Sequence, residues 1–317
     1  MTATAQLVSI IIPAHNVSDY IADTLASVLA QTYQNWEAIV VNDGSTDTAA
    51  LEQTIAPFRE RITYVYQDNR GAGAARNNGI AHAHGEWLAF LDGDDYWTAE
   101  YLERQLSELQ TRNLDLIWCD GNFVGDTALI DKRLTDHSPC TGEVTLVRVI
   151  KGELNIPNSG TVVRRSCVLA VNCIDESIRR GQDFDLWVRL LHSGVVAGYH
   201  DAQMLRYRVR PGNLTGDAIS TLDRELTVLA ILRAKNFLRQ PELAALDWRL
   251  KSLEAAREIT LAKRSLIAKD YPQALARFRS AHLSMPQSKL RLVLLMFPLI
   301  APLMRLWVLA RTPPELR

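Results

Sequence analysis

The pattern of hydrophobic and polar residues changes character along the chain. In the first 120 residues, short apolar runs alternate with segments whose apolar residues recur at helical spacing. An uninterrupted apolar run, such as residues 7–12, is typical of a central parallel strand. Five runs predict strands, at residues 7–12, 36–41, 62–67, 87–91 and 114–119. Strands that alternate with helices in this way predict a parallel, doubly wound sheet.

Beyond residue 120 the pattern is less regular, and residues 121–160 predict mixed strands and loops. A helix is expected over 182–193, with strand candidates at 195–199 and 204–209. From about residue 221 the chain reads as wholly helical. Two antiparallel helices over 253–286 have a spacing similar to one tetratricopeptide-type repeat, carried by Ala256, Leu261, Tyr271, Ala274, Phe278, Ala281 and Pro286. One repeat is too few to stand alone, so we expect it to pack on the domain or a partner.

The last segment is an apolar tail. Residues 292–304 contain no charged side chain, but Pro298, Pro302 and Arg305 interrupt the longer apolar run. Basic residues flank it, namely Lys289, Arg291 and Arg311. This favours peripheral membrane contact through residues 289–311 over a clean membrane span. A buried helix, or one that forms a homo-oligomer, is an equal alternative. The domain prediction is therefore 1–217, 218–288 and 289–317.

Composition excludes some classes of partner. The 35 basic and 36 acidic side chains give a net charge of −1, which offers no electrostatic case for nucleic acid. The four cysteines show no paired spacing and are interpreted as free thiols of a reducing compartment. Because the N-terminus lacks a basic and then apolar leader, we expect a cytoplasmic protein.

Candidate chemistry centres on the loop Asp92-Gly93-Asp94-Asp95, which follows a buried strand. Its carboxylates repel one another unless a cation lies among them. Oxygen ligands suit Mg²⁺ or Mn²⁺, and these ions usually accompany a phosphate-bearing substrate. Ligands of such sheets bind beyond the carboxyl ends of the strands, where residues 13–16 and Asp43 are also expected. The sequence therefore predicts a metal-dependent site for a nucleotide phosphate.

Five segments in consistent order resemble family 2 glycosyltransferases, namely residues 8–16, 27–32, 42–47, 75–79 and 90–95. The resemblance extends over roughly residues 7–215 and stops before the helical region. It implies an inverting, nucleotide-sugar-dependent enzyme. It also implies the GT-A fold, a Rossmann-like, mostly parallel α/β sheet flanked by helices, here with an all-helical C-terminal extension.

The resemblance implies a donor site on the first two strands. Asp43 accepts the N3–H of uracil or thymine, while Pro13, Ala14, His15 and Asn16 line the nucleoside pocket. A carboxylate disfavours cytosine, because an acceptor would then face an acceptor. The alternative is that Asp43 is only a turn residue.

The resemblance also assigns the acidic loop. Asp94 ligates Mg²⁺ or Mn²⁺, and Asp92 holds the ribose or a metal-bound water, or is itself a ligand. Gly93 lets the backbone pass close to the ligand. Arg76 serves the phosphates or the acidic loop. A loop without a metal and a surface arginine are the respective alternatives.

The segment around Asp183 is similar to the family segment that carries the catalytic base. Asp183 fits the second position of the usual acidic pair, and Gln182 replaces the first. The alternative for Asp183 is a helix N-cap. Asp185 is expected to form an exposed pair with Arg189, four residues on.

A later segment, residues 207–215, departs from the family pattern. Arg210 stands where a histidine often completes the metal shell, and arginine cannot ligate a metal ion. Either His200 or water then substitutes, or Arg210 contacts the diphosphate. Asn158 and Ser159 lie in a stretch expected to touch the donor sugar or the acceptor.

These features predict transfer of a sugar from a UDP-sugar, or a dTDP-sugar, to a hydroxyl acceptor with inversion. A glycan or lipid-linked glycan in bacterial surface polysaccharide or glycolipid synthesis, at the inner face of the cytoplasmic membrane, fits the family and the tail. Two rivals remain. One is a dinucleotide-dependent oxidoreductase, because Gly71-Ala72-Gly73 begins like GxGxxG, although Arg76 replaces the third glycine. The other is a non-catalytic scaffold that acts through its helical C-terminus.

Overall fold

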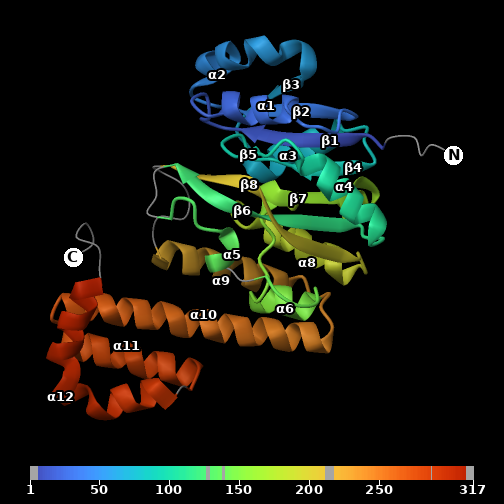
Figure 1. Ribbon diagram of the computed structural model, residues 1–317. Helices are drawn as coiled ribbons and strands as arrows, with labels where there is room; N and C mark the ends of the chain where they lie inside the picture. The colour runs from blue at the N-terminus through green and yellow to red at the C-terminus, as the bar shows by residue number, and fades with distance from the viewer. Residues whose placement is uncertain (1–5, 126–128, 138–139, 211–217, 287, 312–317) are drawn as a thin grey trace. The chain divides into compact units, whose positions relative to one another are not determined.

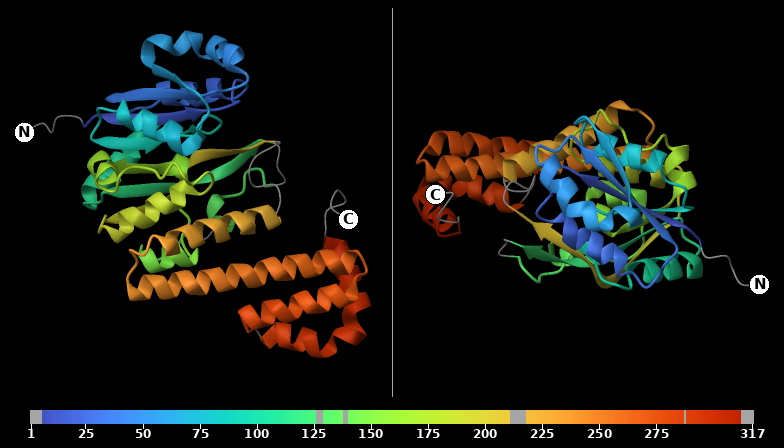
Figure 2. Two further views of the ribbon diagram at one scale, coloured as in Figure 1. Left: turned by 180° about the vertical axis from the view of Figure 1, so that it is seen from behind. Right: turned by 90° about the horizontal axis from the view of Figure 1, so that it is seen from above.

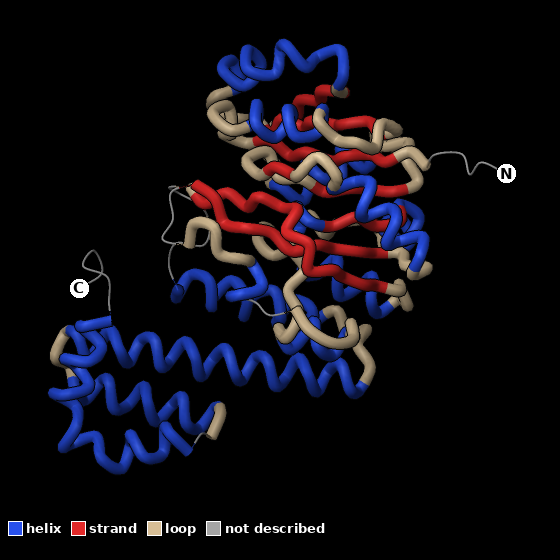
Figure 3. The backbone as a smooth tube through the Cα atoms, viewed as in Figure 1, coloured by secondary structure: helices blue, strands red, loops and turns tan. Residues whose placement is uncertain are grey.

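The computed structural model describes residues 6–125, 129–137, 140–210, 218–286 and 288–311 (Figure 1). The chain divides into two compact units, residues 1–211 and 212–317. The first unit is an eight-stranded sheet with helices on both faces, and the described elements of the second are all helices joined by short loops (Figure 3). The predicted α/β domain with an all-helical extension is therefore confirmed.

The strands are β1 (Val8–Ala14), β2 (Trp36–Asp43), β3 (Thr63–Gln67), β4 (Trp87–Phe90), β5 (Tyr96–Trp97), β6 (Leu116–Gly125), β7 (Thr161–Arg164) and β8 (Ala197–Val209). Their order in the sheet is β3-β2-β1-β4-β7-β6-β8-β5. The pairs β3-β2, β2-β1, β1-β4 and β6-β8 are parallel. All five strands predicted in the first 120 residues are present.

The sheet is mostly parallel, as predicted, and of the described strands β7 and β5 depart from the common direction. β7 lies between β4 and β6 and runs antiparallel to both, and β5 runs antiparallel to β8. The sheet is therefore mixed. The helix α4 (Tyr101–Thr111) carries the chain from β4 to β6 past one strand position, and β7 occupies that position.

The two strand candidates at 195–199 and 204–209 are one continuous strand, β8. Its pairing with β6 shifts register between Cys119 and Asp120 and again between Asp120 and Gly121. A Cβ at Gly121 would lie 2.5 Å from the carbonyl oxygen of Leu205, so only glycine fits there. At this irregularity β8 shifts its register against β6 without ending. The local sequence pattern therefore predicted two short strands where the structure has one long strand.

Alternate side chains of the central strands are buried on opposite faces of the sheet. Ile10 and Ile12 belong to one hydrophobic cluster and Ile11 to the other, which explains the uninterrupted apolar run. The first cluster packs against α1 (Ile21–Leu29), α2 (Thr48–Ile55) and α4. The second packs against α3 (Ala72–Ala81), α6 (Leu146–Lys151), α7 (Arg165–Ala170) and α8 (Gln182–His192). Figure 2 shows the sheet and its helices from two further sides. Short helical turns complete this unit: η1 (Ala56–Arg61), α5 (Leu134–His137) and η2 (Asn158–Gly160).

The second unit contains α9 (Ala218–Ala234), α10 (Gln240–Ile267), α11 (Tyr271–Ser284) and α12 (Ser288–Arg311). The side chain of Asp270 caps α11 by accepting a hydrogen bond from the backbone N–H of Gln273. On α11 the repeat-like positions 274, 278 and 281 are buried. On α10, however, Ala255 and Ala262 are buried rather than the neighbouring positions 256 and 261.

Candidate active site

The loops that follow β1, β2 and β4 meet at the carboxyl edge of the sheet, because these strands pair side by side in parallel. The Nδ1 atom of His15 lies 3.0 Å from the carbonyl oxygen of Asp43. The backbone N–H of Asn16 donates to the hydroxyl of Ser45 at 3.2 Å. His15 and Asn16 are exposed, whereas Ala14 is buried. The structure thus brings together the residues expected to line the nucleoside pocket.

Asp43 is held by the segment that follows β3. Its Oδ1 accepts hydrogen bonds from the side chain of Gln67 at 2.8 Å and the backbone N–H of Arg70 at 2.9 Å. Its Oδ2 accepts one from the backbone N–H of Gly71 at 2.8 Å. Gly71 has a φ of +91°, which favours glycine. Asp43 therefore fixes this loop as well as ending β2, a role that the sequence reasoning missed.

Each of the three acids of the loop after β4 has a hydrogen-bond partner that lies far from it in the sequence. Arg76 of α3 donates from Nη2 to Oδ1 of Asp92. Arg210 donates from Nε to Oδ2 of Asp94 at 2.7 Å. The backbone N–H of Arg208 donates to Oδ1 of Asp95 at 2.8 Å. Arg76 is only 5% exposed, so the surface-arginine alternative is wrong.

These partners do not fully compensate the carboxylates of the loop, as the raised pKa values of Asp94 and Asp95 indicate. Burial raises the pKa of Asp94, the carboxylate of Asp92 raises it further, and Arg210 offsets only part of the effect. Burial followed by Asp94 and Asp92 raises the pKa of Asp95 well above its usual range. Oδ2 of Asp95 is buried and has no hydrogen-bond partner among the described residues. The loop is therefore a site where an additional cation would be stabilised.

Gly93 is required by a close approach within the protein. A Cβ at this position would lie 3.0 Å from the carbonyl oxygen of Pro13 and 3.1 Å from a methyl group of Val17. Glycine here lets the acidic loop pack directly against the end of β1. The structure thereby gives Gly93 a reason besides the expected approach to a ligand.

Arg210 lies where a metal ion would be needed. Its guanidinium contacts the carboxylate of Asp94, the expected metal ligand, and donates from Nη1 to the carbonyl oxygen of Asn16 at 3.1 Å. His200 does not replace the missing histidine. Its Nε2 lies 3.1 Å from Oε1 of Gln105, and its Nδ1 accepts a hydrogen bond from the backbone N–H of Ala202.

The donor chemistry of the loop nevertheless fits Mg²⁺ or Mn²⁺. Asp92 and Asp94 offer carboxylate oxygens, which such ions prefer. Within the described ranges, no group of three or more His, Cys, Asp or Glu side chains is arranged to hold a metal ion. The protein therefore fits a divalent ion only if Arg210 leaves Asp94 and oxygens of a substrate or of water complete the shell.

Asp183 occupies the second residue of α8, after Gly181 at the N-cap. The N-cap alternative for Asp183 is therefore wrong. Its carboxylate makes no hydrogen bond or ion pair with the described residues. Its charge acts on Arg76 and on Tyr207, together with the charges of the acidic loop. The structure thus places near that loop a carboxylate that has no partner among the described residues.

The expected exposed pair of Asp185 and Arg189 is instead buried. The side chain of Asp185 is fully buried, and its Oδ2 accepts from Nε of Arg189 at 2.7 Å. Arg189 also donates to the carbonyl oxygen of Val171, just after α7. The pair lies on the face of α8 that packs against the domain, a fact that helical spacing alone could not reveal.

Several residues reach the acidic loop from β8 and η2. Arg208 donates from Nε to the carbonyl oxygen of Asp94 at 2.9 Å. The backbone N–H of Asp92 donates to the hydroxyl of Ser159 at 3.1 Å, and the amide of Asn158 lies between Asp92 and Arg76. Asn158 and Ser159 were expected near the donor or the acceptor, and the family-like segment around Arg208 was the available signal for β8. Residues 211–215 of that segment lie outside the described residues.

Tyr207 of β8 begins the family-like segment 207–215, but the sequence reasoning gave it no role of its own. Burial, followed by the charges of Asp95, Asp92, Asp94 and Asp183, raises the pKa of its hydroxyl. A neutral phenol at this point can donate a hydrogen bond to a carboxylate or to a bound oxygen.

A family model and several named relatives match this chain. The model of the family described as Glycosyl transferase family 2 matches residues 9–168. The glycosyltransferase TuaG of Bacillus subtilis (strain 168), whose name refers to teichuronic acid biosynthesis, is 35% identical over 217 residues, 66% of this chain and 81% of TuaG. WfgD of Escherichia coli, named as a UDP-Glc:alpha-D-GlcNAc-diphosphoundecaprenol beta-1,3-glucosyltransferase, is 28% identical over 230 residues, 70% of this chain and 85% of WfgD.

Solved structures show the same fold. Residues 1–349 of TarS from S. aureus, in complex with UDP-GlcNAc, align with a TM-score of 0.63 at 19% identity, covering 96% of this chain and 88% of that one. The mannosyltransferase PcManGT from Pyrobaculum calidifontis, in complex with GDP-Man and Mn²⁺, aligns with a TM-score of 0.63 at 16% identity, covering 96% and 84%. At these identities the likeness concerns the fold.

Proposed function

We propose, from the premise that this chain belongs to glycosyltransferase family 2, that it moves a sugar from a UDP-sugar to a hydroxyl group of a lipid-linked glycan, with inversion. The observation that carries the proposal is the group of Asp92, Asp94, Arg76 and Asp183 at the carboxyl edge of the sheet. The acceptor class is supported by WfgD, whose name specifies a diphosphoundecaprenol-linked sugar, and the donor class by WfgD and by TarS with UDP-GlcNAc.

Neither rival function has comparable support. In an oxidoreductase, the glycines at 71 and 73 would cradle a pyrophosphate. Here the backbone N–H of Gly71 is already bound to Asp43, and a Cβ at Gly73 would meet the side chain of Ile174 at 3.2 Å. Those glycines therefore serve packing and loop closure. A scaffold role is disfavoured because the chain's relatives are named as glycosyltransferases.

The donor is held at two points in this proposal. The uracil ring lies over the loops of β1 and β2, where a lone pair of Asp43 accepts its N3–H and His15 and Asn16 border the pocket. The diphosphate lies at the acidic loop, where Arg76 and Arg210 supply positive charge. Asp94, with Asp92 as the second candidate, would hold Mg²⁺ or Mn²⁺, which would act there as a Lewis acid.

In the reaction, the acceptor hydroxyl attacks the anomeric carbon from the face opposite UDP. Asp183 accepts the hydroxyl proton as the new C–O bond forms. The bond from the anomeric carbon to the phosphate oxygen breaks, and its electron pair leaves with UDP. Arg76 and Arg210 stabilise the negative charge that develops on the departing diphosphate. One displacement inverts the configuration, and no covalent enzyme intermediate forms.

The test is a screen of UDP- and dTDP-sugars with a synthetic GlcNAc-diphospholipid as acceptor. We expect UDP release and a glycolipid product of inverted configuration from at least one UDP-sugar. Chelation by EDTA should lower the rate if Asp94 holds a divalent ion, and Mn²⁺ should restore it. Binding of UDP without product from any donor would reject the proposed acceptor, whereas failure to bind any uridine nucleotide would reject the whole proposal.

We also propose that α12 rests on the inner face of the cytoplasmic membrane, where lipid-linked acceptors are found. The helix is long and apolar enough to cross a membrane, yet one side of it is packed against the protein. Phe297, Ala301 and Val308 are buried in the core of the second unit, and the ring of Phe297 lies 5.9 Å from that of Phe278. Spanning the membrane would require this side to leave its core, so in-plane contact is favoured.

The other side of α12 is an exposed apolar surface. Leu295 is 74% exposed, Leu299 79% and Leu303 66%, and Lys289 and Arg291 near the start of the helix favour anionic lipid headgroups. The double variant Leu295→Glu/Leu299→Glu should no longer sediment with phosphatidylglycerol vesicles. A double glutamine variant at exposed Glu60 and Arg61 of η1, E60Q/R61Q, serves as the surface control. If the wild-type protein does not sediment but forms dimers that L295E/L299E dissociates, the surface is instead an interface between copies.

A further inference from the structure

A second concave site lies in the first unit, away from the acidic loop. The cavity has a volume of about 300 Å³ and is formed chiefly by β6, β8 and the segments around α5 and residue 155. Apart from His200, which was weighed as a metal ligand, its lining contains none of the residues expected to bind the donor or the ion. Its lining includes Trp118, Asp120, Arg133, Thr141, Asn155 and Tyr199. This volume is at the small end of the range for ligand sites and suits one ring rather than an extended chain.

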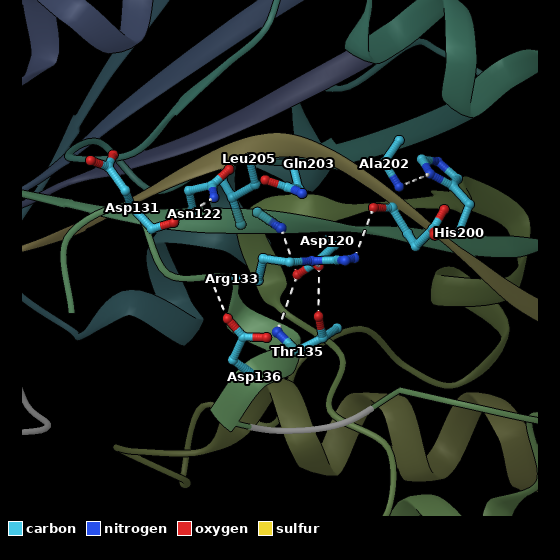
Figure 4. Close-up of polar contacts among 12 residues, drawn as sticks. Asp120, Asn122, Asp131, Arg133, Thr135, Asp136, His200, Ala202, Gln203 and Leu205 are labelled. Atoms are coloured by element: carbon cyan, nitrogen blue, oxygen red, sulfur yellow. Dashed lines mark hydrogen bonds and ion pairs between the residues drawn. The ribbon is translucent and has the colours of Figure 1, made fainter.

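The carboxylate of Asp120 fixes the segments that line the cavity. Its Oδ2 accepts hydrogen bonds from Nε of Arg133 and from the hydroxyl of Thr135, both at 2.7 Å. Its Oδ1 accepts from the backbone N–H groups of Thr135 at 3.2 Å and Gly121 at 2.8 Å. Figure 4 shows Arg133 and Thr135 converging on this carboxylate from the segment around α5. The hydrogen bonds of Asp120 thus fix that segment beside the irregular part of the β6–β8 pair. The cavity lies between the segment and these two strands.

The lining combines an aromatic wall with hydrogen-bonding groups. Tyr199 stacks on Trp118 with ring centroids 5.4 Å apart, and its hydroxyl donates to the carbonyl oxygen of Gly142 at 3.1 Å. Thr141 and Asn155 are exposed at the cavity and offer a hydroxyl and an amide. An aromatic face packs against the C–H groups of a sugar ring, while hydroxyl and amide groups bind its hydroxyls.

The charges of the lining disfavour a phosphate. Arg133 is its one arginine and is already paired with Asp120, and Asp201 adds a second carboxylate. Burial lowers the pKa of His200, whose ring nitrogens are both engaged within the protein. An anionic ligand would therefore meet more negative than positive charge, whereas a neutral, hydroxyl-rich ring would not.

The cavity is joined to the acidic loop by one short stretch of chain. Asn155 and Pro157 line the cavity, and the next two residues, Asn158 and Ser159, contact Asp92. Trp118 also belongs to the same hydrophobic cluster as Trp187 of α8, the helix that carries Asp183. Cys119, the next residue of the lining, belongs to the other cluster, so the cavity draws on both faces of the sheet.

From these contacts we infer that the cavity binds a neutral sugar ring of the acceptor glycan during transfer. The inference rests on the proposed function, because it identifies where that reaction holds its acceptor. It assigns recognition of the ring to Tyr199, Thr141 and Asn155, and a positioning role to Asp120, which keeps Arg133 and α5 in place.

Saturation-transfer NMR on the full chain tests the inference, with methyl α-N-acetylglucosaminide and methyl α-glucoside as probes and inorganic phosphate as a competitor. Thr141→Trp would fill the cavity. Thr111→Trp, at an equally exposed threonine at the end of α4, is the matched control. We expect at least one glycoside to bind the wild-type protein and T111W, to bind T141W about 10-fold more weakly, and to resist displacement by phosphate.

A second pair of variants separates the aromatic wall from the fold. Tyr199→Phe keeps the ring and should retain glycoside binding within about threefold, whereas Tyr199→Ala should lose about 10-fold. UDP affinity, measured on the same samples, should stay unchanged in every variant. If the wild-type protein binds a glycoside but does not bind UDP, the proposed function is refuted and the sugar site is not. No glycoside binding by the wild type, or equal binding by T141W and T111W, would overturn the sugar site.

Discussion

Asp120 and Asp95 are two buried acids of the first unit, and they differ in how many hydrogen bonds the protein donates to them. Asp120 accepts four hydrogen bonds, from Arg133, Thr135 and Gly121. Asp95 accepts one from Arg208, and its other oxygen is buried without a partner among the described residues. An acid supplied with donors holds the fold together, whereas acids that are left to repel one another are available to bind a ligand.

The same contrast appears on a single helix. Asp185 is buried and paired with Arg189, while Asp183, two residues earlier, has no partner among the described residues. The predictions below test whether an acid's role follows from how well the protein satisfies it.

The largest expected effect is on turnover. Asp183→Asn should lower kcat about 10²- to 10⁴-fold, because it removes the proposed base. UDP affinity should stay within about twofold, since Asp183 makes no contact that holds the donor loops. Asp185→Asn is the control on the same helix and should lower the free energy of unfolding rather than the turnover of the folded enzyme. Steady-state kinetics and urea unfolding distinguish the two, and near-normal turnover by D183N would remove Asp183 from the mechanism.

The next effect is on stability. Asp120→Asn should lower the free energy of unfolding by about 2–3 kcal/mol, because it weakens hydrogen bonds to a charged acceptor and leaves Arg133 without its counter-ion. Asp201→Asn, on an exposed aspartate at the same cavity, should change it by less than about 0.5 kcal/mol. Urea unfolding of both variants gives the comparison. Equal stability of D120N and D201N would show that an acid which accepts several hydrogen bonds need not contribute to the stability of the fold.

A smaller effect concerns Arg210, which forms an ion pair with the carboxylate of Asp94. Arg210→Ala should raise the affinity for Mn²⁺ about 10-fold, because the carboxylate no longer has to exchange its guanidinium for the ion. UDP binding in EDTA should weaken at the same time. Electron paramagnetic resonance of free Mn²⁺ measures the first change, and calorimetry with UDP the second. Arg104→Ala, in an exposed pair on α4, is the control, and unchanged Mn²⁺ binding by R210A would remove Asp94 as the ligand.

The smallest effect is a change in the pH dependence of stability. The pKa values of Asp94 and Asp95 are raised in the folded protein, so between the unfolded value of about 3.9 and the raised values the folded state binds more protons. Their contribution is therefore fully present below about pH 4 and is lost as the pH rises through the folded pKa values.

Asp95→Asn tests this dependence. The variant should gain stability relative to the wild type, by about 1 kcal/mol, as the pH rises through that window. Urea unfolding at a series of pH values measures the difference. A difference that stays constant with pH would mean that neither burial nor the neighbouring carboxylates raise the pKa of Asp95 in the folded protein.

The amino-acid sequence by itself determined the first half of the molecule. The strands β1, β2 and β4 could be predicted because each is a short run buried on both faces, and the acidic loop because it interrupts such a run abruptly. Parallel neighbours end at the same edge of the sheet, so the meeting of residues 13–16, Asp43 and Asp92 followed from local pattern and elementary topology.

Only the tertiary structure decided the partners of those acids. Arg210 reaches Asp94 across 116 residues and Ser159 reaches Asp92 across 67, and nothing in the local periodicity selects these pairs. The position of β7, the continuous course of β8 and the cavity beside Asp120 are undetermined by pattern for the same reason. Periodicity records which face of an element is buried, whereas the choice of neighbour depends on packing and on hydrogen bonds between segments distant in the chain.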